Sequence, residues 1–225
     1  MFFRIALLVL RKDFAIEVKS REILTMTLLF AVSCVLVFAF ALVKEGEAPP
    51  DAAPAILWIA IMFSGTLALG RTFERERYGE TLRALLLAPA PRPALYVGKL
   101  LGVVSLLGVA ELVLVPLVAF FFGAPFFVKP LLMLLMLVAG TVGFAAVGTL
   151  FAAMLMRVRT RDVLLPILLY PITVPVIIAG VRGTAALLAT PADETTATMW
   201  LAIVLAFDVV FITLSLWTFE VLMTE

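Results

Sequence analysis

The chain has 225 residues, of which 64% are hydrophobic and only 15% are charged, and its formal net charge is +1. Soluble domains carry about 25% charged residues, so this composition excludes a soluble globular protein, a disordered tail and a nucleic-acid-binding protein. Histidine is absent, which excludes a Ser-His or Cys-His catalytic pair, a histidine-coordinated metal and a histidine axial ligand to haem.

Other familiar site motifs are missing as well. Cys34 is the single cysteine, so neither an intrachain disulfide nor a cysteine-ligated iron–sulfur cluster can form within one chain. The Gly98-Lys99 pair is followed by Leu100 and lacks the upstream glycine of a phosphate-binding loop. We therefore expect no ATPase activity in this chain itself and no cofactor bound tightly by it.

Residues 1–22 are too charged to cross a membrane. Helical spacing places five apolar side chains on one face. These residues are Phe3, Leu7, Leu10, Phe14 and Val18. The pattern predicts an amphipathic helix in the cytoplasmic membrane interface, with the apolar face in the lipid. Two interpretations remain open: a surface anchor alone, or a helix that also contacts a cytosolic partner.

Residues 23–225 form the predicted membrane domain. A helix needs about 20 apolar residues to cross the hydrocarbon core, and six stretches are long enough. We expect the first to be retained, because it begins too late and is too long for a signal peptide. The six stretches are 23–43, 53–70, 94–122, 130–156, 163–180 and 199–223.

The distribution of Lys and Arg predicts the orientation, since cytoplasmic loops are enriched in basic residues. Of the 17 Lys and Arg residues, only Lys44, Lys129 and Arg182 fall in the connections assigned to the other side. With six spans, both termini are then expected in the cytoplasm. The basic residues assigned to the cytoplasmic side are Arg4, Arg11, Lys12, Lys19, Arg21, Arg71, Arg75, Arg77, Arg83, Arg92, Lys99, Arg157, Arg159 and Arg161.

The longest predicted cytoplasmic connection is 71–93. Its first part is densely charged up to Gly79, and 80–88 then form a short predicted helix that ends at a run of prolines. Leu82, Leu85 and Leu86 share one face of that helix. Such a face, presented to the cytosol, needs a groove to fill; the alternative is a loop that lies on the membrane surface.

Two acidic residues lie deep inside predicted spans, Glu111 in the third and Asp208 in the sixth. A carboxylate at the bilayer centre costs roughly 2.5–3.5 kcal/mol on insertion scales, and no Lys or Arg lies at a comparable depth. One interpretation is that both acids line a substrate path or a subunit interface. The other is that they are neutral acids hydrogen-bonded to neighbouring helices.

Small residues and prolines mark further features of the spans. Spacings of four predict close packing within the bundle, with dimerisation as the alternative, at Gly98/Gly102 (followed by Ser105), Ala139/Gly143 and Gly148/Ala152. Pro166, Pro171 and Pro175 each remove a helical hydrogen bond, so the fifth span should be kinked and should line protein or water. The segment 181–198 is expected to be a long non-cytoplasmic connection with a short re-entrant helix.

An interfacial N-terminal helix, six spans and a charged loop after the second span resemble the permease subunits of ABC-2-type transporters. Local motifs are more specific, and together they resemble the CcmB family, the haem exporter proteins B of bacterial cytochrome c maturation. The resemblance extends over the whole chain. The matching motifs are AILWIA at 55–60, LALGR at 67–71, FERER at 73–77, GETLRALLLAP at 79–89 and LLYPITVPVII at 168–178.

The resemblance implies an all-α, ABC-2-type bundle in the bacterial inner membrane, assembled as a homodimer. It also implies a separate ATPase, CcmA, which binds ATP, with CcmC, CcmD and the haem chaperone CcmE as further partners. Haem would be a transported or handled ligand, and no catalytic residue is implied. The implied ATPase-docking set is Glu74, Arg75, Glu76, Gly79, Glu80, Leu82, Leu86 and Pro89.

Two other functions stay open at this point. One is an ABC-2-type permease that exports a lipid, a glycan or a drug. The other is an intramembrane enzyme that uses Glu111 and Asp208 as acid and base or as metal ligands, although the sequence offers no third ligand and no nucleophile beside them.

Overall fold

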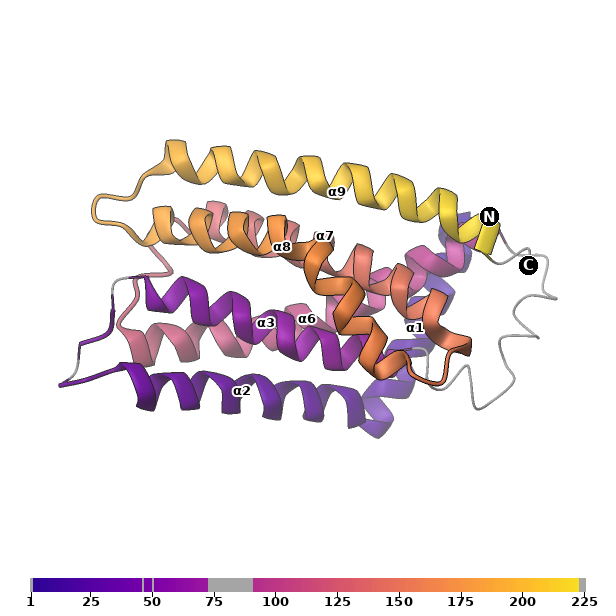
Figure 1. Cartoon of the computed structure of the whole chain (residues 1–225), viewed down its shortest axis with the longest axis horizontal. Helices are drawn as coiled ribbons and strands as arrows, with labels where there is room; N and C mark the ends of the chain where they lie inside the picture. The colour runs from indigo at the N-terminus through magenta and orange to yellow at the C-terminus, as the bar shows by residue number, and fades with distance from the viewer. Residues whose placement is uncertain (1, 46, 50, 73–90, 223–225) are drawn as a thin grey trace.

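The computed structural model describes residues 2–45, 47–49, 51–72 and 91–222. In these ranges the chain is helical and forms an elongated bundle (Figure 1). The helices are α1 (Phe2–Ser20), α2 (Glu22–Leu42), α3 (Ala52–Thr72), α6 (Arg92–Phe122), α7 (Pro130–Met154), the short 3-10 helix η1 (Leu155–Arg157), α8 (Arg161–Leu188) and α9 (Glu194–Leu222).

The six predicted spans are confirmed, because α2, α3, α6, α7, α8 and α9 are each long and apolar enough to cross a membrane. The prediction for 181–198 is wrong. Helix α8 continues to Leu188 and α9 begins at Glu194, so the connection is short and holds no re-entrant helix. The continuation is stable because the polar Arg182 is exposed while Gly183 and Thr184 are buried against the bundle.

Helices α3 and α7 form the centre of the bundle. In the most apolar 18-residue stretch of each, 67% of the residues are buried, whereas only 22% are buried in the corresponding stretches of α2 and α9. Trp58 of α3 shows how the centre is packed: its indole is 1% exposed and lies against Gly140 of α7 and Gly180 of α8, where any Cβ atom would overlap the ring. The two glycines allow three helices to approach one another around a single large side chain.

The predicted small-residue packing is confirmed at most of its positions. Side chains of α9 and α3 pack against Gly143 and Gly148 of α7, and α1 packs against Gly98 of α6. The exception is the continuation along α6. Among the described residues, none comes within 4 Å of where a Cβ atom of Gly102 would lie, and the Ser105 hydroxyl bonds only to the Leu101 carbonyl of its own helix.

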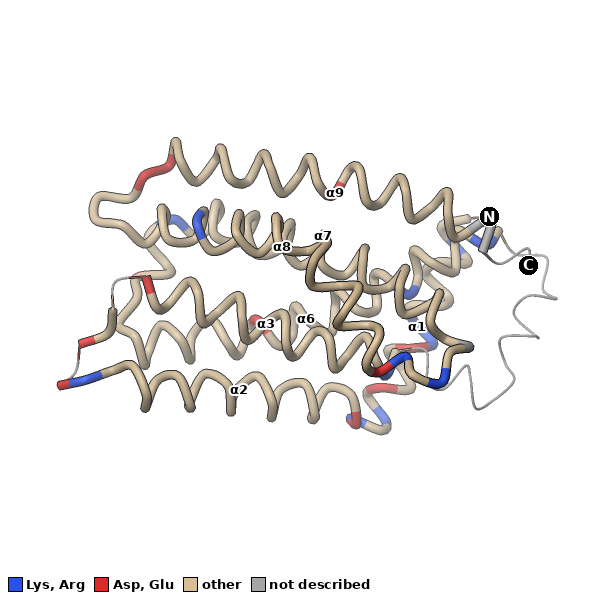
Figure 2. The backbone as a smooth tube through the Cα atoms, viewed as in Figure 1, with Lys and Arg blue, Asp and Glu red and all other residues tan. Residues whose placement is uncertain are grey.

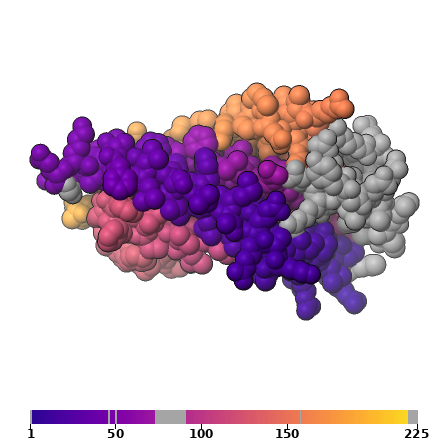
Figure 3. Space-filling view, turned by 90° about the horizontal axis from the view of Figure 1, so that it is seen from below, coloured from indigo at the N-terminus to yellow at the C-terminus, as the bar shows by residue number. Residues whose placement is uncertain are grey.

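Helix α1 packs on α6 by its small-residue side. A Cβ atom at Gly98 would lie 2.8 Å from the Ala6 carbonyl oxygen and 2.7 Å from Val9 Cβ. Most of the predicted apolar face of α1 points outward, with Phe3 83% and Leu7 61% exposed. Figure 3 shows α1 and α2 on the face of the bundle that is seen from below. This arrangement fits a helix whose outer face meets lipid.

The turn between α1 and α2 is tight. Arg21 adopts a left-handed conformation with φ of 54°, and the Glu17 carboxylate accepts a 2.8 Å hydrogen bond from the Leu24 backbone N–H. That bond satisfies one of the free N–H groups in the first turn of α2. The predicted boundary between residues 22 and 23 falls in the first turn of α2, just after this turn.

Helix α8 carries Pro166, Pro171 and Pro175 inside its length. Figure 1 shows α8 bent, with its first part running obliquely and its second part along the bundle. Each proline lacks the N–H that would bond to the preceding turn, which gives the physical cause of the bend.

Charged residues gather at the two ends of the bundle (Figure 2). One end carries α1, the end of α3, the start of α8 and the end of α9 (Figure 1). The opposite end carries the described residues of the α2–α3 connection (43–45, 47–49 and 51) and the connections at 123–129 and 189–193. At this end Lys129 and Glu194 form an ion pair at 2.5 Å. At the same end, the Asp193 carboxylate caps α9 by accepting a 3.0 Å hydrogen bond from the Thr196 backbone N–H. Hydrogen bonds from Thr196 lower the pKa of Asp193.

Candidate functional site

The connection 71–93 begins where α3 ends and finishes where α6 begins. All members of the predicted docking set lie outside the described residues: Glu74, Arg75, Glu76, Gly79, Glu80, Leu82, Leu86 and Pro89. What the structure places is the pair of helix ends that hold this connection, Thr72 at the end of α3 and Arg92 at the start of α6.

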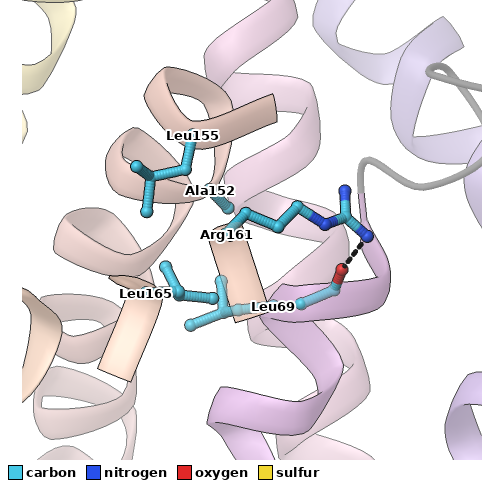
Figure 4. Close-up of a pocket in the computed structure, with 6 residues that line it drawn as sticks. Leu69, Ala152, Leu155, Arg161 and Leu165 are labelled. Atoms are coloured by element: carbon cyan, nitrogen blue, oxygen red, sulfur yellow. Dashed lines mark hydrogen bonds between the residues drawn. The ribbon is translucent and has the colours of Figure 1, made fainter. Parts of the chain in front are cut away.

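The end of α3 is held by an arginine from α8. Arg161 is only 6% exposed, and its Nη2 atom donates a 2.8 Å hydrogen bond to the carbonyl oxygen of Gly70. Figure 4 shows the side chain reaching across a small recess to that carbonyl, above Leu69 and Leu165. The last carbonyls of a helix lack intrahelical partners and carry partial negative charge, so a guanidinium stabilises this end of α3.

A lysine from α6 holds the same end from another side. Lys99 is 6% exposed; its Nζ atom donates to the Thr72 carbonyl oxygen at 3.2 Å and pairs with Asp13 Oδ2 of α1 at 2.9 Å. One ammonium group therefore joins α1, α6 and α3. Since Asp13 also pairs with Lys12 at 3.0 Å, a small ionic cluster lies at the junction of these helices.

Helices α3 and α8 are joined at two further levels. The Thr66 and Tyr170 hydroxyls share a hydrogen bond of 3.2 Å. Nearer the other end, the Trp58 indole N–H donates to the Thr184 hydroxyl at 3.0 Å, and both of these side chains are buried. Together with Arg161, these contacts tie α3 to α8 on both sides of the proline-containing bend.

The two intramembrane acids are both buried, Glu111 at 8% and Asp208 at 6% exposure. Glu111 of α6 accepts a hydrogen bond from the Thr141 hydroxyl of α7. For Glu111 this is the geometry of an acid bonded to a neighbouring helix, as one of the two interpretations expected.

Asp208 of α9 lies against Gly143 of α7, and its Oδ1 atom has no hydrogen-bond partner within the described part of the chain. Thr141 and Gly143 are two residues apart, about 3 Å along the helix axis. The two acids therefore approach α7 at nearly the same level from different sides. Among the described residues, no three His, Cys, Asp or Glu side chains form a group that could hold a metal ion.

Comparisons with known proteins decide which family this architecture represents. The family model described as CcmB protein matches residues 4–223. The chain belongs to the CcmB family. Similar relatives include Heme exporter protein B of Pseudomonas aeruginosa, 28% identical over 68% of this chain and 68% of that protein.

Two more relatives carry the same name. Heme exporter protein B of Paracoccus denitrificans is 30% identical over 77% of this chain and 78% of that protein. Heme exporter protein B of Escherichia coli K12 is 32% identical over 51% of this chain and 50% of that protein. The CcmB family assignment and the six apolar helices make this chain a multi-pass membrane protein.

Sequence reasoning missed the two cations that hold the end of α3. The charge pattern places Arg161 and Lys99 on the cytoplasmic side but predicts no partner for either. One local signal exists: Arg161 is the first residue of α8, where a positive charge is unfavourable for the helix itself. A cation in such a position needs a partner elsewhere, but only the fold shows that this partner is the Gly70 carbonyl of α3.

Proposed function

We propose that this chain is the permease subunit of an ABC transporter complex for cytochrome c maturation. In this proposal it couples ATP hydrolysis by a partner ATPase to haem export or to release of a haem-loaded chaperone. The match of the CcmB family model over residues 4–223 is the observation that carries the proposal. The relatives named Heme exporter protein B support the link to haem.

The partners we propose are CcmA as the ATPase and CcmC, CcmD and CcmE as neighbours and client. The ATP site is assigned to CcmA because this sequence has no phosphate-binding loop. Two copies of the chain would present two docking loops to two ATPase subunits. The chain itself is proposed to be non-catalytic, since Glu111 is engaged with Thr141 inside the bundle.

The proposed location is the bacterial inner membrane, with both termini in the cytoplasm. The supporting observation is the charge asymmetry between the two sides of the spans. In this orientation, the end of α3 that carries Gly70 and Thr72 faces the ATPase.

Haem would be handled without firm ligation by this chain. Histidine is the usual protein ligand for haem iron, and the sequence contains none. We propose that the bundle moves around haem held by partner proteins.

The test is maturation of c-type cytochromes in a strain that lacks this chain. The wild-type chain should restore covalently bound haem, whereas Leu86→Asp and Glu80→Lys should insert in the membrane but fail to retain the ATPase and fail to restore haem. Leu86→Met is the matched control and should behave as wild type.

Two results would contradict the proposal. Normal covalent haem in the strain without the chain would remove the link to cytochrome maturation and would favour export of a lipid, a glycan or a drug. Full retention of the ATPase by both loop variants would remove the docking assignment.

A further inference from the structure

We propose that Arg161 and Lys99 are positioning residues that carry movement of the α3 end to α8 and α1. The inference rests on the proposed function, because the connection that follows α3 is where the ATPase would act. It adds to that function a specific route from the ATPase side into the bundle.

The position of Arg161 is unfavourable for α8 alone. A positive charge at a helix N-terminus opposes the helix dipole, whereas the same charge at a C-terminus is stabilising. Arg161 begins α8 but reaches the C-terminal carbonyl of Gly70 in α3 at 2.8 Å, with Asp162 at 3.4 Å on its own helix. The bond to Gly70 therefore links the position of the start of α8 to that of the end of α3.

Lys99 makes the corresponding link toward the membrane surface. Its ammonium group lies between the Thr72 carbonyl and the Asp13 carboxylate. Burying this charge is costly unless it stays paired and hydrogen-bonded. A shift of Thr72 therefore either pulls Lys99 and α1 with it or leaves a buried ammonium with fewer partners.

The bend in α8 lies between contacts with α3. All three prolines of α8 stand between Arg161 and the Trp58–Thr184 contact. Within that stretch, Tyr170 bonds to Thr66. The part of α8 before the prolines can thus follow the end of α3, while the part after them stays bonded to Trp58 through Thr184. Movement that begins at Gly70 and Thr72 would be converted into a change in the bend of α8.

The functional test uses the complex purified from membranes in lipid nanodiscs. Arg161→Gln should leave ATPase binding unchanged but reduce the chaperone released per ATP hydrolysed at least tenfold. Arg161→Lys keeps a cation near Gly70 and should recover most of this coupling. Arg159→Gln is the matched control, because Arg159 is exposed and lies two positions away.

The structural test does not depend on haem. In a Cys34→Ser background, spin labels at the exposed positions Leu67 of α3 and Val163 of α8 report the distance between the helices near the contact. The distribution should be narrow in the wild type and in Arg159→Gln, and wider or shifted in Arg161→Gln. Labels at Phe14 of α1 and Leu101 of α6 report the distance between those two helices, and Lys99→Met should widen or shift that distribution in the same way.

The outcomes separate this inference from the proposed function. Unchanged release per ATP in Arg161→Gln, or parallel loss of ATPase binding and release, would overturn the positioning role. Unchanged label distances in both variants would overturn the structural linkage. If the wild-type chain retains no ATPase, the proposed function fails, and the label distances still decide whether the two cations fix these helices.

Discussion

At the scale of single residues, glycines determine how closely the central helices approach. Trp58 occupies a space that exists only because Gly140 and Gly180 have no side chains. The indole N–H is satisfied by Thr184 at 3.0 Å, so the ring is fixed both by packing and by a hydrogen bond. In a membrane, where lipid is as apolar as the protein interior, such close contacts are the main source of helix association.

Gly140→Ala should therefore destabilise the bundle by about 1–3 kcal/mol, as overpacking of a filled core does. The matched control is Gly102→Ala, because a Cβ atom there meets open space and should change the stability by less than about 1 kcal/mol. Thermal unfolding of the detergent-solubilised protein measures both variants. Equal melting temperatures would show that the Trp58 site is not tightly packed.

The bond between Glu111 and Thr141 predicts a structural role for this acid. Glu111→Gln keeps an oxygen acceptor and should support near wild-type cytochrome maturation. Thr141→Val removes the donor from a buried acid and should cost about 0.5–2 kcal/mol, while Thr213→Val, at an exposed hydroxyl bonded to its own helix, should be neutral.

A different pattern would point to a charged, functional Glu111. If Glu111→Gln abolished haem attachment while the variant remained folded and abundant in the membrane, the acid would be needed for its charge. The interpretation as a hydrogen-bond acceptor would then be wrong.

At the scale of helices, α1 is placed by its contact with Gly98. Gly98→Val should push α1 away from α6, because the Val9 side chain and the Ala6 carbonyl already fill the space. In a Cys34→Ser background, a cysteine at Ala6, which is 2% exposed, should be protected from thiol reagents in the parent and reactive in Gly98→Val. Gly108→Val is the control and should preserve protection, since no atom of the described residues lies within 4 Å of where a Cβ atom of Gly108 would be.

Most helix bounds followed from the sequence because long apolar runs with few or no charges are a direct signal of membrane spans. The exception, 181–198, shows the limit of that signal. Arg182 and two glycines dilute the hydropathy of the last turns of α8, although a helix there buries Thr184 and Leu187 and exposes only the arginine. Tertiary packing decided the helix end, and local composition could not.

The residue contacts at the end of α3 were beyond sequence reasoning for a similar reason. Arg161 and Gly70 are 91 positions apart, and Lys99 and Thr72 are 27 apart. The charge distribution predicts a side of the membrane for each cation. The partner of each depends on how α6 and α8 pack beside α3.

At the scale of the whole molecule, the charge asymmetry predicts which end faces the cytoplasm. In a Cys34→Ser background, a cysteine at the exposed Asp51 should react with a membrane-impermeant maleimide in intact cells. A cysteine at Arg159, exposed at the opposite end, should react only after the membrane is permeabilised. The reverse pattern would place both termini outside and would remove the basis for a cytoplasmic docking loop.

The most direct test of the account is quantitative co-purification of the intact chain from native membranes, with its partners identified by mass spectrometry. The account predicts that an ABC ATPase is recovered in near-equal amount with the chain and that a haem chaperone is recovered with them. Recovery of the chain without any ATPase, or with an ATPase and a lipid or glycan transport machinery in place of the haem chaperone, would contradict it.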